Sequence, residues 1–143
     1  TIYDKSILDK KLKNVHFKGY LTYSDLTKKI KNYKILLMPY KKNVGVLMKN
    51  INVVNYFSPL KMFDYLASGK IILASDLSVY KNILKNNKNA FLIKDDPNLW
   101  SKKIVNTLKS KKFDYLGKVA REHSKKYTWI KRVKKIFKFY EKN

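Results

Sequence analysis

The sequence of 143 residues predicts an α/β domain in which helices flank a parallel β-sheet. Short apolar segments of roughly four residues alternate with longer segments of helical character, which is the pattern of βα units. Two of the apolar segments, 35–38 and 71–74, are continuous runs, as expected for buried strands. Since 45% of the residues are hydrophobic and 14% are aromatic, the chain can form a core. The sequence therefore predicts one Rossmann-like domain over residues 1–143.

The first part of the chain begins with a predicted strand over 15–17, which ends at Gly19. A helix should follow from Ser24 to about residue 32, because Ser24 is a suitable N-cap. The apolar run 35–38 is the next expected strand. Residues 41–56 are polar and irregular, so we expect a loop there.

The segment SPLKMFDYLASGK predicts a helix with an unusual charge at its start. Ser58 is the expected N-cap, Pro59 the first helical residue, and Gly69 the end of the helix. Lys61 then falls at the third helical position, where a capping box would have Glu or Gln. The first acid is Asp64, one turn later. A cation beside the positive end of the helix dipole is unfavourable, so Lys61 calls for an explanation.

The remainder of the chain continues the alternation of strands and helices. The expected elements are the strand 71–74, a helix over 78–84, a turn at 86–89, the strand 90–93, and helices over 97–108, 112–125 and 129–141. Asp96 followed by Pro97 is a typical helix start, because Asp caps well and Pro fits the first helical position. We therefore interpret Asp95 and Asp96 as a cap and not as a metal site.

The helix that begins near Ser58 lies where a parallel sheet usually binds its ligand. It follows the loop that leaves the strand 35–38, and ligands bind at the carboxyl ends of such strands. The N–H groups of Leu60 and Lys61, together with the helix dipole, form an anion site that suits a diphosphate. Asp64, on the same face, suits the two hydroxyls of a ribose. The alternative is a common Ser-Pro helix start with a solvated Lys61.

A resemblance to a known family adds to this interpretation. The segment SPLKMFDYLASGKIILASDLSVYKNIL resembles the C-terminal domain of GT-B glycosyltransferases of the group-1, family 4-like class. The flanking segments NVHFKGYLTYSDLTKKIKNYKILLMPY and NAFLIKDDPNLWSKKI resemble the strands and helices on either side of that motif. The segment AREHSKKYTWIKRVKKIFKFY resembles the final helices. The resemblance covers about residues 14–140 and implies the C-terminal half of a GT-B fold.

The family implies roles for the residues that match its motif. Ser58, Leu60 and Lys61 would hold the diphosphate of a nucleotide-sugar donor of the UDP or GDP type. Asp64 takes the place of a Glu that binds the ribose, and it is one methylene shorter. Tyr56 stands where a second Glu contacts the sugar in many members, so sugar recognition departs from the family pattern.

Three further residues are candidate contacts to the base or the sugar by the same resemblance. Gly19 and Tyr20 lie at a turn that is near the nucleotide base in similar proteins, and Tyr40 would line the same cleft. The family's acceptor domain has no counterpart in this chain, and residues 1–13 do not resemble the first strand of the donor domain. We therefore expect a donor domain that is incomplete at its N-terminus and transfers no sugar by itself.

The implied reaction is a retaining transfer of sugar from the nucleotide-sugar to an acceptor glycan or lipid-linked sugar. Such enzymes build surface polysaccharides or glycolipids. The helix start and Lys61 would stabilise the leaving diphosphate. The sequence has no D-x-D motif, and neither a metal nor a cofactor is expected. The expected location is the cytoplasm, with peripheral contact to the anionic inner face of the membrane.

The net charge of +23 would attract nucleic acid or an anionic membrane. Of the 33 basic residues only Arg121 and Arg132 are Arg, whereas grooves that read bases favour Arg. The Lys residues are spread over the chain, so we expect no specific nucleic-acid partner. Three alternatives remain: a basic nucleic-acid-binding module, a GT-like remnant without a working site, and Lys enrichment that reflects composition alone. No cysteine is present, so no disulfide forms.

The two histidines and the C-terminal aromatic residues are expected to be structural. His16 lies between apolar residues and is predicted to be a core or strand-face residue. His123 has no second ligand at metal spacing. An apolar stripe with helical spacing near the C-terminus is expected to be buried in the domain, or else to face the missing acceptor domain. The stripe consists of Trp129, Val133, Ile136, Phe137 and Tyr140.

Overall fold

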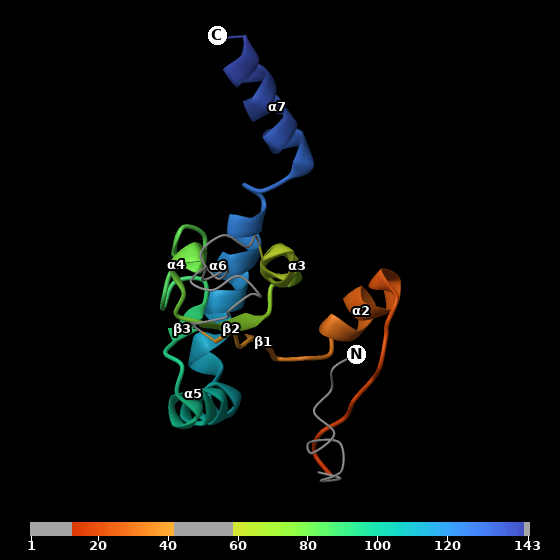
Figure 1. Ribbon diagram of the computed structural model, residues 1–143. Helices are drawn as coiled ribbons and strands as arrows, with labels where there is room; N and C mark the ends of the chain where they lie inside the picture. The colour runs from red at the N-terminus through yellow and green to blue at the C-terminus, as the bar shows by residue number, and fades with distance from the viewer. Residues whose placement is uncertain (1–12, 42–58, 142–143) are drawn as a thin grey trace, which may run out of the picture.

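The computed structural model describes residues 13–41 and 59–141, and it contains a three-stranded parallel sheet flanked by helices (Figure 1). The strands are β1 (Ile35–Met38), β2 (Ile71–Ser75) and β3 (Phe91–Ile93), in the order β1-β2-β3. Ile35 lies opposite Ile71 in the register of the first pair, and Leu73 lies opposite Phe91 in the second. The predicted α/β class with a parallel sheet is therefore confirmed.

Helices cover both faces of the sheet because β2 is apolar on both sides. On one face, Ile72 and Ala74 pack against α3 (Leu60–Ser68) and α4 (Ser78–Lys81). On the other face, Ile71 and Leu73 pack against residues of α5 (Pro97–Lys109). Figure 1 shows α5 on the opposite side of the sheet from α3 and α4. All five residues of β2 are buried, as a continuous apolar run predicts.

Helix α6 (Asp114–Ser124), which follows the short 3-10 helix η2 (Lys111–Phe113), joins the two layers. Its Leu116 belongs to the apolar cluster of the α5 face, and its Ala120 belongs to the cluster of the α3 face. Gly117 lies against the end of α3, where a Cβ atom would come within 2.1 Å of the Gly69 carbonyl oxygen. Gly69 itself ends α3 with a φ of 70°. Two glycines thus permit a backbone contact between α6 and the α3–β2 turn.

The predicted strand over 15–17 is wrong. These residues form no strand, and the side chains of Val15 and Phe17 are 41% and 50% exposed. His16 is exposed as well, so its predicted place in a core or on a strand face is also wrong. The physical reason is that an apolar segment of this length needs a neighbouring strand, and within the described residues β1 pairs only with β2.

Two helices begin at other residues than predicted. The first helix, α2 (Tyr23–Ile30), is capped by Thr22 and not by Ser24, because the Thr22 hydroxyl oxygen accepts a bond of 3.2 Å from the Asp25 N–H. Helix α3 begins at Leu60 with Pro59 as its N-cap, so Lys61 is the second helical residue and not the third.

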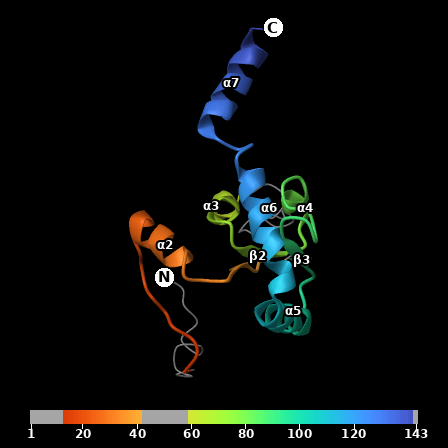
Figure 2. The same ribbon diagram turned by 180° about the vertical axis from the view of Figure 1, so that it is seen from behind.

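The remaining helices end close to their predicted limits, except for the helix that was predicted over 78–84. The predicted helix over 78–84 is only the single turn α4, after which the chain bends toward the turn before β3. The last helix, α7 (Trp129–Tyr140), has its predicted span, but the predicted burial of its apolar stripe is wrong. Figure 2 shows α7 directed away from the sheet, so no other described element covers it.

Substitution of Gly117 by Ala should destabilise the domain. In an ordinary helix this change is stabilising by about 1 kcal/mol, because Gly is a poor helix former. Here the new methyl group would overlap the Gly69 backbone, and such overpacking typically costs about 1–3 kcal/mol. Urea unfolding should therefore show a lower midpoint for Gly117→Ala than for the wild type.

The matched control, Lys118→Ala at the next and exposed position of α6, should be close to neutral. A Gly117→Ala protein as stable as the wild type would contradict the close contact.

Candidate functional site

The candidate site lies at the carboxyl edge of the sheet, where β1 and β2 end and α3 begins. Just after β1, the backbone N–H of Tyr40 donates a hydrogen bond of 2.7 Å to Ser75 Oγ at the end of β2. Ser75 is buried, so this bond continues the pairing of the two strands beyond their last apolar residues. Tyr40 is thereby held at the edge of the sheet.

Tyr40 is also packed against the buried side chain of Tyr80 from α4. The two ring centroids are 6.5 Å apart, and the rings meet edge to face at 67°. Burial raises the pKa of the Tyr80 hydroxyl, and the nearby Tyr40 adds to this effect. Burial likewise raises the pKa of Tyr65 on α3. Tyr65 and Tyr80 therefore stay neutral at ordinary pH, and Tyr80 forms an aromatic wall with Tyr40.

Lys61 stands beside this wall at the start of α3. Its ammonium lies 5.9 Å from the centroid of the Tyr40 ring, within the range of a cation–π contact. The side chain is exposed, and residues 60–63 contain no acid that would neutralise it. The charge adds to the positive end of the α3 dipole, so the two fields reinforce each other. This arrangement favours an anion over the helix start.

The backbone of the helix start supplies hydrogen-bond donors for such an anion. The first backbone bond of α3 runs from the Met62 N–H to the Pro59 carbonyl at 2.9 Å. The N–H groups of Leu60 and Lys61 come before it, and within residues 59–141 no side chain caps this helix. Leu60 is 73% exposed, so this end of α3 is open to solvent at Leu60. Two N–H groups and one ammonium can therefore contact the same ligand oxygen atoms.

Asp64 lies one turn further along α3 and contacts helix α2. Its carboxylate accepts a hydrogen bond of 3.1 Å from the Tyr23 hydroxyl. This bond, with the negative charge of Asp64, raises the pKa of Tyr23. Since a carboxylate can accept about four hydrogen bonds, one tyrosine leaves acceptor capacity for ribose hydroxyls. Asp64 and Lys61 thus present opposite charges one turn apart on one helix.

The structure brings together only part of the predicted site. Lys61 and Tyr40 contact each other, and Leu60 and Asp64 lie on the same first turns of α3. Gly19 and Tyr20 lie on the extended segment before α2, where Gly19 has a φ of 65° and Tyr20 is 94% exposed. The positive φ fits the predicted turn at Gly19. The predicted contacts Tyr56 and Ser58 lie outside the described residues.

Sequence reasoning missed the residues that support the site from other elements. Tyr23 reaches Asp64 across 41 positions of the chain, and Ser75 reaches Tyr40 across 35. No local spacing signals these contacts, because they depend on how α2 and β2 pack. The only available clue to Tyr80 was an aromatic residue in the helix that follows a buried strand.

The predicted cap at the start of α5 can be compared with the structure. Asp96 caps α5 as predicted, since its Oδ1 accepts hydrogen bonds from the N–H groups of Asn98 and Leu99 at 2.8 and 3.4 Å. Among residues 13–41 and 59–141, no group of three or more His, Cys, Asp or Glu side chains could hold a metal ion. In the same part of the chain, no helix has both the length and the apolar character needed to cross a bilayer.

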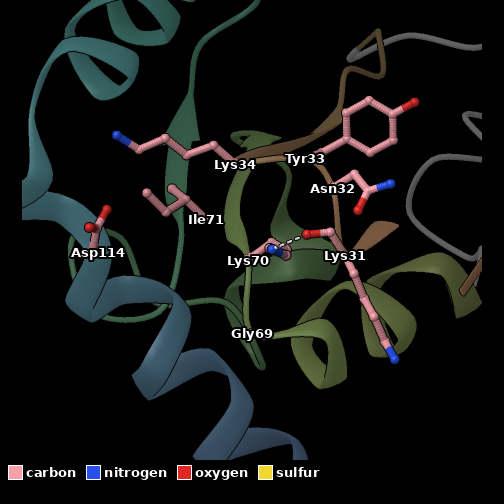
Figure 3. A pocket seen from close by; sticks show the side chains of 8 residues that line it. All are labelled: Lys31, Asn32, Tyr33, Lys34, Gly69, Lys70, Ile71 and Asp114. Atoms are coloured by element: carbon pink, nitrogen blue, oxygen red, sulfur yellow. Dashed lines mark hydrogen bonds between the residues drawn. The ribbon is translucent and has the colours of Figure 1, made fainter. Parts of the chain in front are cut away.

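A pocket at the opposite, amino edge of the sheet does not belong to this site (Figure 3). Two of its three basic residues, Lys34 and Lys70, are bonded to backbone carbonyls. The Lys70 ammonium donates to the Lys31 carbonyl at 2.5 Å, and the Lys34 ammonium donates to the Leu108 carbonyl at 3.1 Å. The first bond joins the turns before β1 and β2, and the second joins the turn before β1 to the end of α5, so we interpret the pocket as structural.

His123 near the end of α6 is held in one protonation state. The Lys85 N–H donates to Asn89 Oδ1 at 2.7 Å, which fixes the orientation of the buried amide. The Asn89 amide nitrogen therefore points at His123 Nδ1, 2.9 Å away, so Nδ1 must accept the bond and be unprotonated. Burial, with the charges of Lys126 and Lys85, lowers the pKa of His123.

Comparison with known proteins identifies no family for this chain, so its class is defined by its fold. No protein-family model matches the sequence, and no curated protein matches it significantly. The fold and the geometry define an α/β domain with a parallel sheet, whose carboxyl edge carries a basic and acid-free helix start.

The lowered pKa of His123 predicts a stability that falls with acidification. The unfolded histidine titrates near its ordinary value of 6.5 and binds protons more readily than the folded one. The stability that the neutral His123 contributes is therefore fully present above pH 6.5. It is lost as the pH falls through 6.5 toward the pKa of the folded protein. Urea unfolding between about pH 5 and pH 8 should show this loss in the wild type. It should be weaker in His123→Gln and unchanged in the control His16→Gln, whose ring is exposed. Equal slopes in all three proteins would contradict the assigned state.

Proposed function

We propose that this chain is the donor-binding domain of a GT-B-type retaining glycosyltransferase. The observation that carries the proposal is the start of α3, where Lys61, two backbone N–H groups and the helix dipole converge beside Tyr40. A diphosphate carries the charge and the oxygen acceptors that this arrangement favours. The position at the carboxyl edge of a parallel sheet supports the same interpretation.

In this proposal each part of a nucleoside diphosphate has its own contact. The diphosphate lies over Leu60 and Lys61, with Ser58 as a further contact by resemblance to the family. The ribose hydroxyls donate to Asp64, which shares its carboxylate between the ligand and Tyr23. The aromatic ring of Tyr40, which lies beside the Lys61 ammonium, flanks the ligand in this proposal. Gly19, Tyr20 and Tyr56 stay candidate contacts to the base or the sugar.

The proposed reaction needs a second domain. The donor would be a UDP- or GDP-type nucleotide-sugar, and the acceptor a glycan or lipid-linked sugar bound by an acceptor domain. When the sugar leaves, negative charge develops on the diphosphate, and Lys61 with the α3 start would stabilise it electrostatically. We propose that this takes place in the cytoplasm, and that the chain alone binds the donor without transferring the sugar.

Substitutions in α3 test the donor site. Lys61→Glu should weaken UDP or GDP binding by about 2 kcal/mol or more, roughly 30-fold, because repulsion replaces attraction at the diphosphate. Asp64→Ala should weaken binding of the nucleotides far more than binding of inorganic pyrophosphate, which has no ribose. Calorimetric titration at one fixed ionic strength measures both effects.

A charge-matched control separates the site from the general field of a protein with a net charge of +23. Lys102→Glu changes the net charge equally, but it lies exposed on α5, across the sheet from α3. This variant should bind the nucleotide almost as the wild type does. If Lys102→Glu and Lys61→Glu lose equal affinity, the attraction is generic and the α3 site is refuted. Failure of both UDP and GDP to bind would favour the remnant without a working site.

A further inference from the structure

Helix α7 has a large apolar surface that no other described element covers. Thr128 caps the helix by accepting a bond of 3.3 Å from the Lys131 N–H, so α7 is a well-defined helix. Its seven large apolar side chains are all 46–84% exposed. They are Trp129, Ile130, Val133, Ile136, Phe137, Phe139 and Tyr140. Contiguous exposed apolar side chains in this number mark an interaction surface.

The polar face of α7 carries charge of one sign. At 100° per residue, most of the apolar side chains gather on one face and the lysines lie on the other. The basic residues of the helix are Lys131, Arg132, Lys134, Lys135 and Lys138, and residues 129–140 contain no acid. The surface that α7 contacts must therefore accept apolar side chains and carry negative charge beside them.

An anionic lipid bilayer combines both properties. Its acyl boundary accepts the apolar face, and its head groups attract the lysines on the flanks. Trp129 and Tyr140 stand at the two ends of α7, and these residue types favour the membrane interface. Twelve helical residues extend about 18 Å, which is too short to cross a hydrocarbon core of about 30 Å. The helix would consequently lie in the plane of the interface.

The other occupants fit the charges of α7 less well. The acceptor domain that the resemblance implies would cover the apolar face, but it would also have to supply acids for the five basic residues of the helix, which the head groups of an anionic bilayer supply directly. A second copy of the chain would bring a second cationic helix and another net charge of +23 to the contact, and like charges repel. Nucleic acid supplies phosphates, but it offers no apolar layer for Ile130, Val133 and Ile136.

We propose that α7 is an interfacial membrane helix that binds anionic lipid through its apolar face and its lysines. This proposal does not rest on nucleotide binding, because the contacts of Tyr40, Lys61 and Asp64 described above are made with α2, α4, β2 and one another, and not with α7. It assigns membrane contact to one helix rather than to the general positive charge of the domain.

The test uses the full chain and vesicles that contain about a third phosphatidylglycerol in phosphatidylcholine. The chain has two tryptophans, so Trp100→Phe leaves Trp129 as the only indole reporter. Its fluorescence should shift to the blue on anionic vesicles and stay unchanged on pure phosphatidylcholine. In sedimentation with the vesicles, the double variant Ile136→Ser and Phe137→Ser should lose at least about 10-fold in affinity, although its charge is unchanged.

A control variant with the same kind of change is available on α5. Val105 and Leu108 are exposed to similar extents, 45% and 52%, so Val105→Ser and Leu108→Ser together should leave vesicle binding unaltered. Circular dichroism checks that both double variants keep their helices. Equal binding by the two double variants would overturn the proposal. Displacement from the vesicles by random-sequence duplex DNA at equal phosphate concentration would also overturn it, since binding would then be generic attraction between charges.

Discussion

The contact between Gly117 of α6 and the Gly69 carbonyl is the constraint on which the arrangement of the domain depends. It fixes the end of α3 at the amino edge of the sheet, while Leu116 and Ala120 on either side of Gly117 join the two apolar clusters. Helix α3 is rigid and about 13 Å long, so fixing its end also positions its start. The packing of two glycines at one edge therefore determines where Lys61 stands at the other.

The electrostatics of the molecule follow from where its few acids lie. The chain has 10 acids against 33 basic residues, and several lysines of the described residues donate to backbone carbonyls instead of carboxylates, among them Lys34, Lys70 and Lys85. Near the candidate site, the acid is placed one turn after Lys61 and is bonded to Tyr23, so the first turn of α3 keeps its positive field. On α7 the acids are missing from the helix altogether, and the basic face is left unbalanced. In both proposals, specific binding would therefore depend on local geometry added to a general positive charge.

Sequence patterns predicted those parts of the structure that depend on local rules. The strands β1, β2 and β3 follow from continuous apolar runs, and the start of α5 follows from Asp96 and Pro97. The patterns did not reveal that residues 15–17 lack a strand partner, because pairing depends on distant segments. Lys61 and Asp64 were predicted from one motif, and Tyr40 was predicted from the resemblance that this motif carries. The residues that contact them from other elements were not predicted, because only folding brings these elements together. They are Tyr23, Ser75 and Tyr80. The spacing of the apolar residues from Trp129 to Tyr140 predicted an apolar helix face, but it did not predict what covers this face.

The most direct test of the central claim is to observe the backbone amides at the start of α3 while the ligand binds. Proton–nitrogen correlation spectra of the full chain, titrated with UDP and with GDP, report each amide separately. The proposed donor site predicts that the largest chemical-shift changes occur at the N–H groups of Leu60 and Lys61, with smaller changes toward Asp64. Largest shifts at Lys34 and Lys70 on the opposite edge, or small shifts spread over all lysine-rich surfaces, would contradict it.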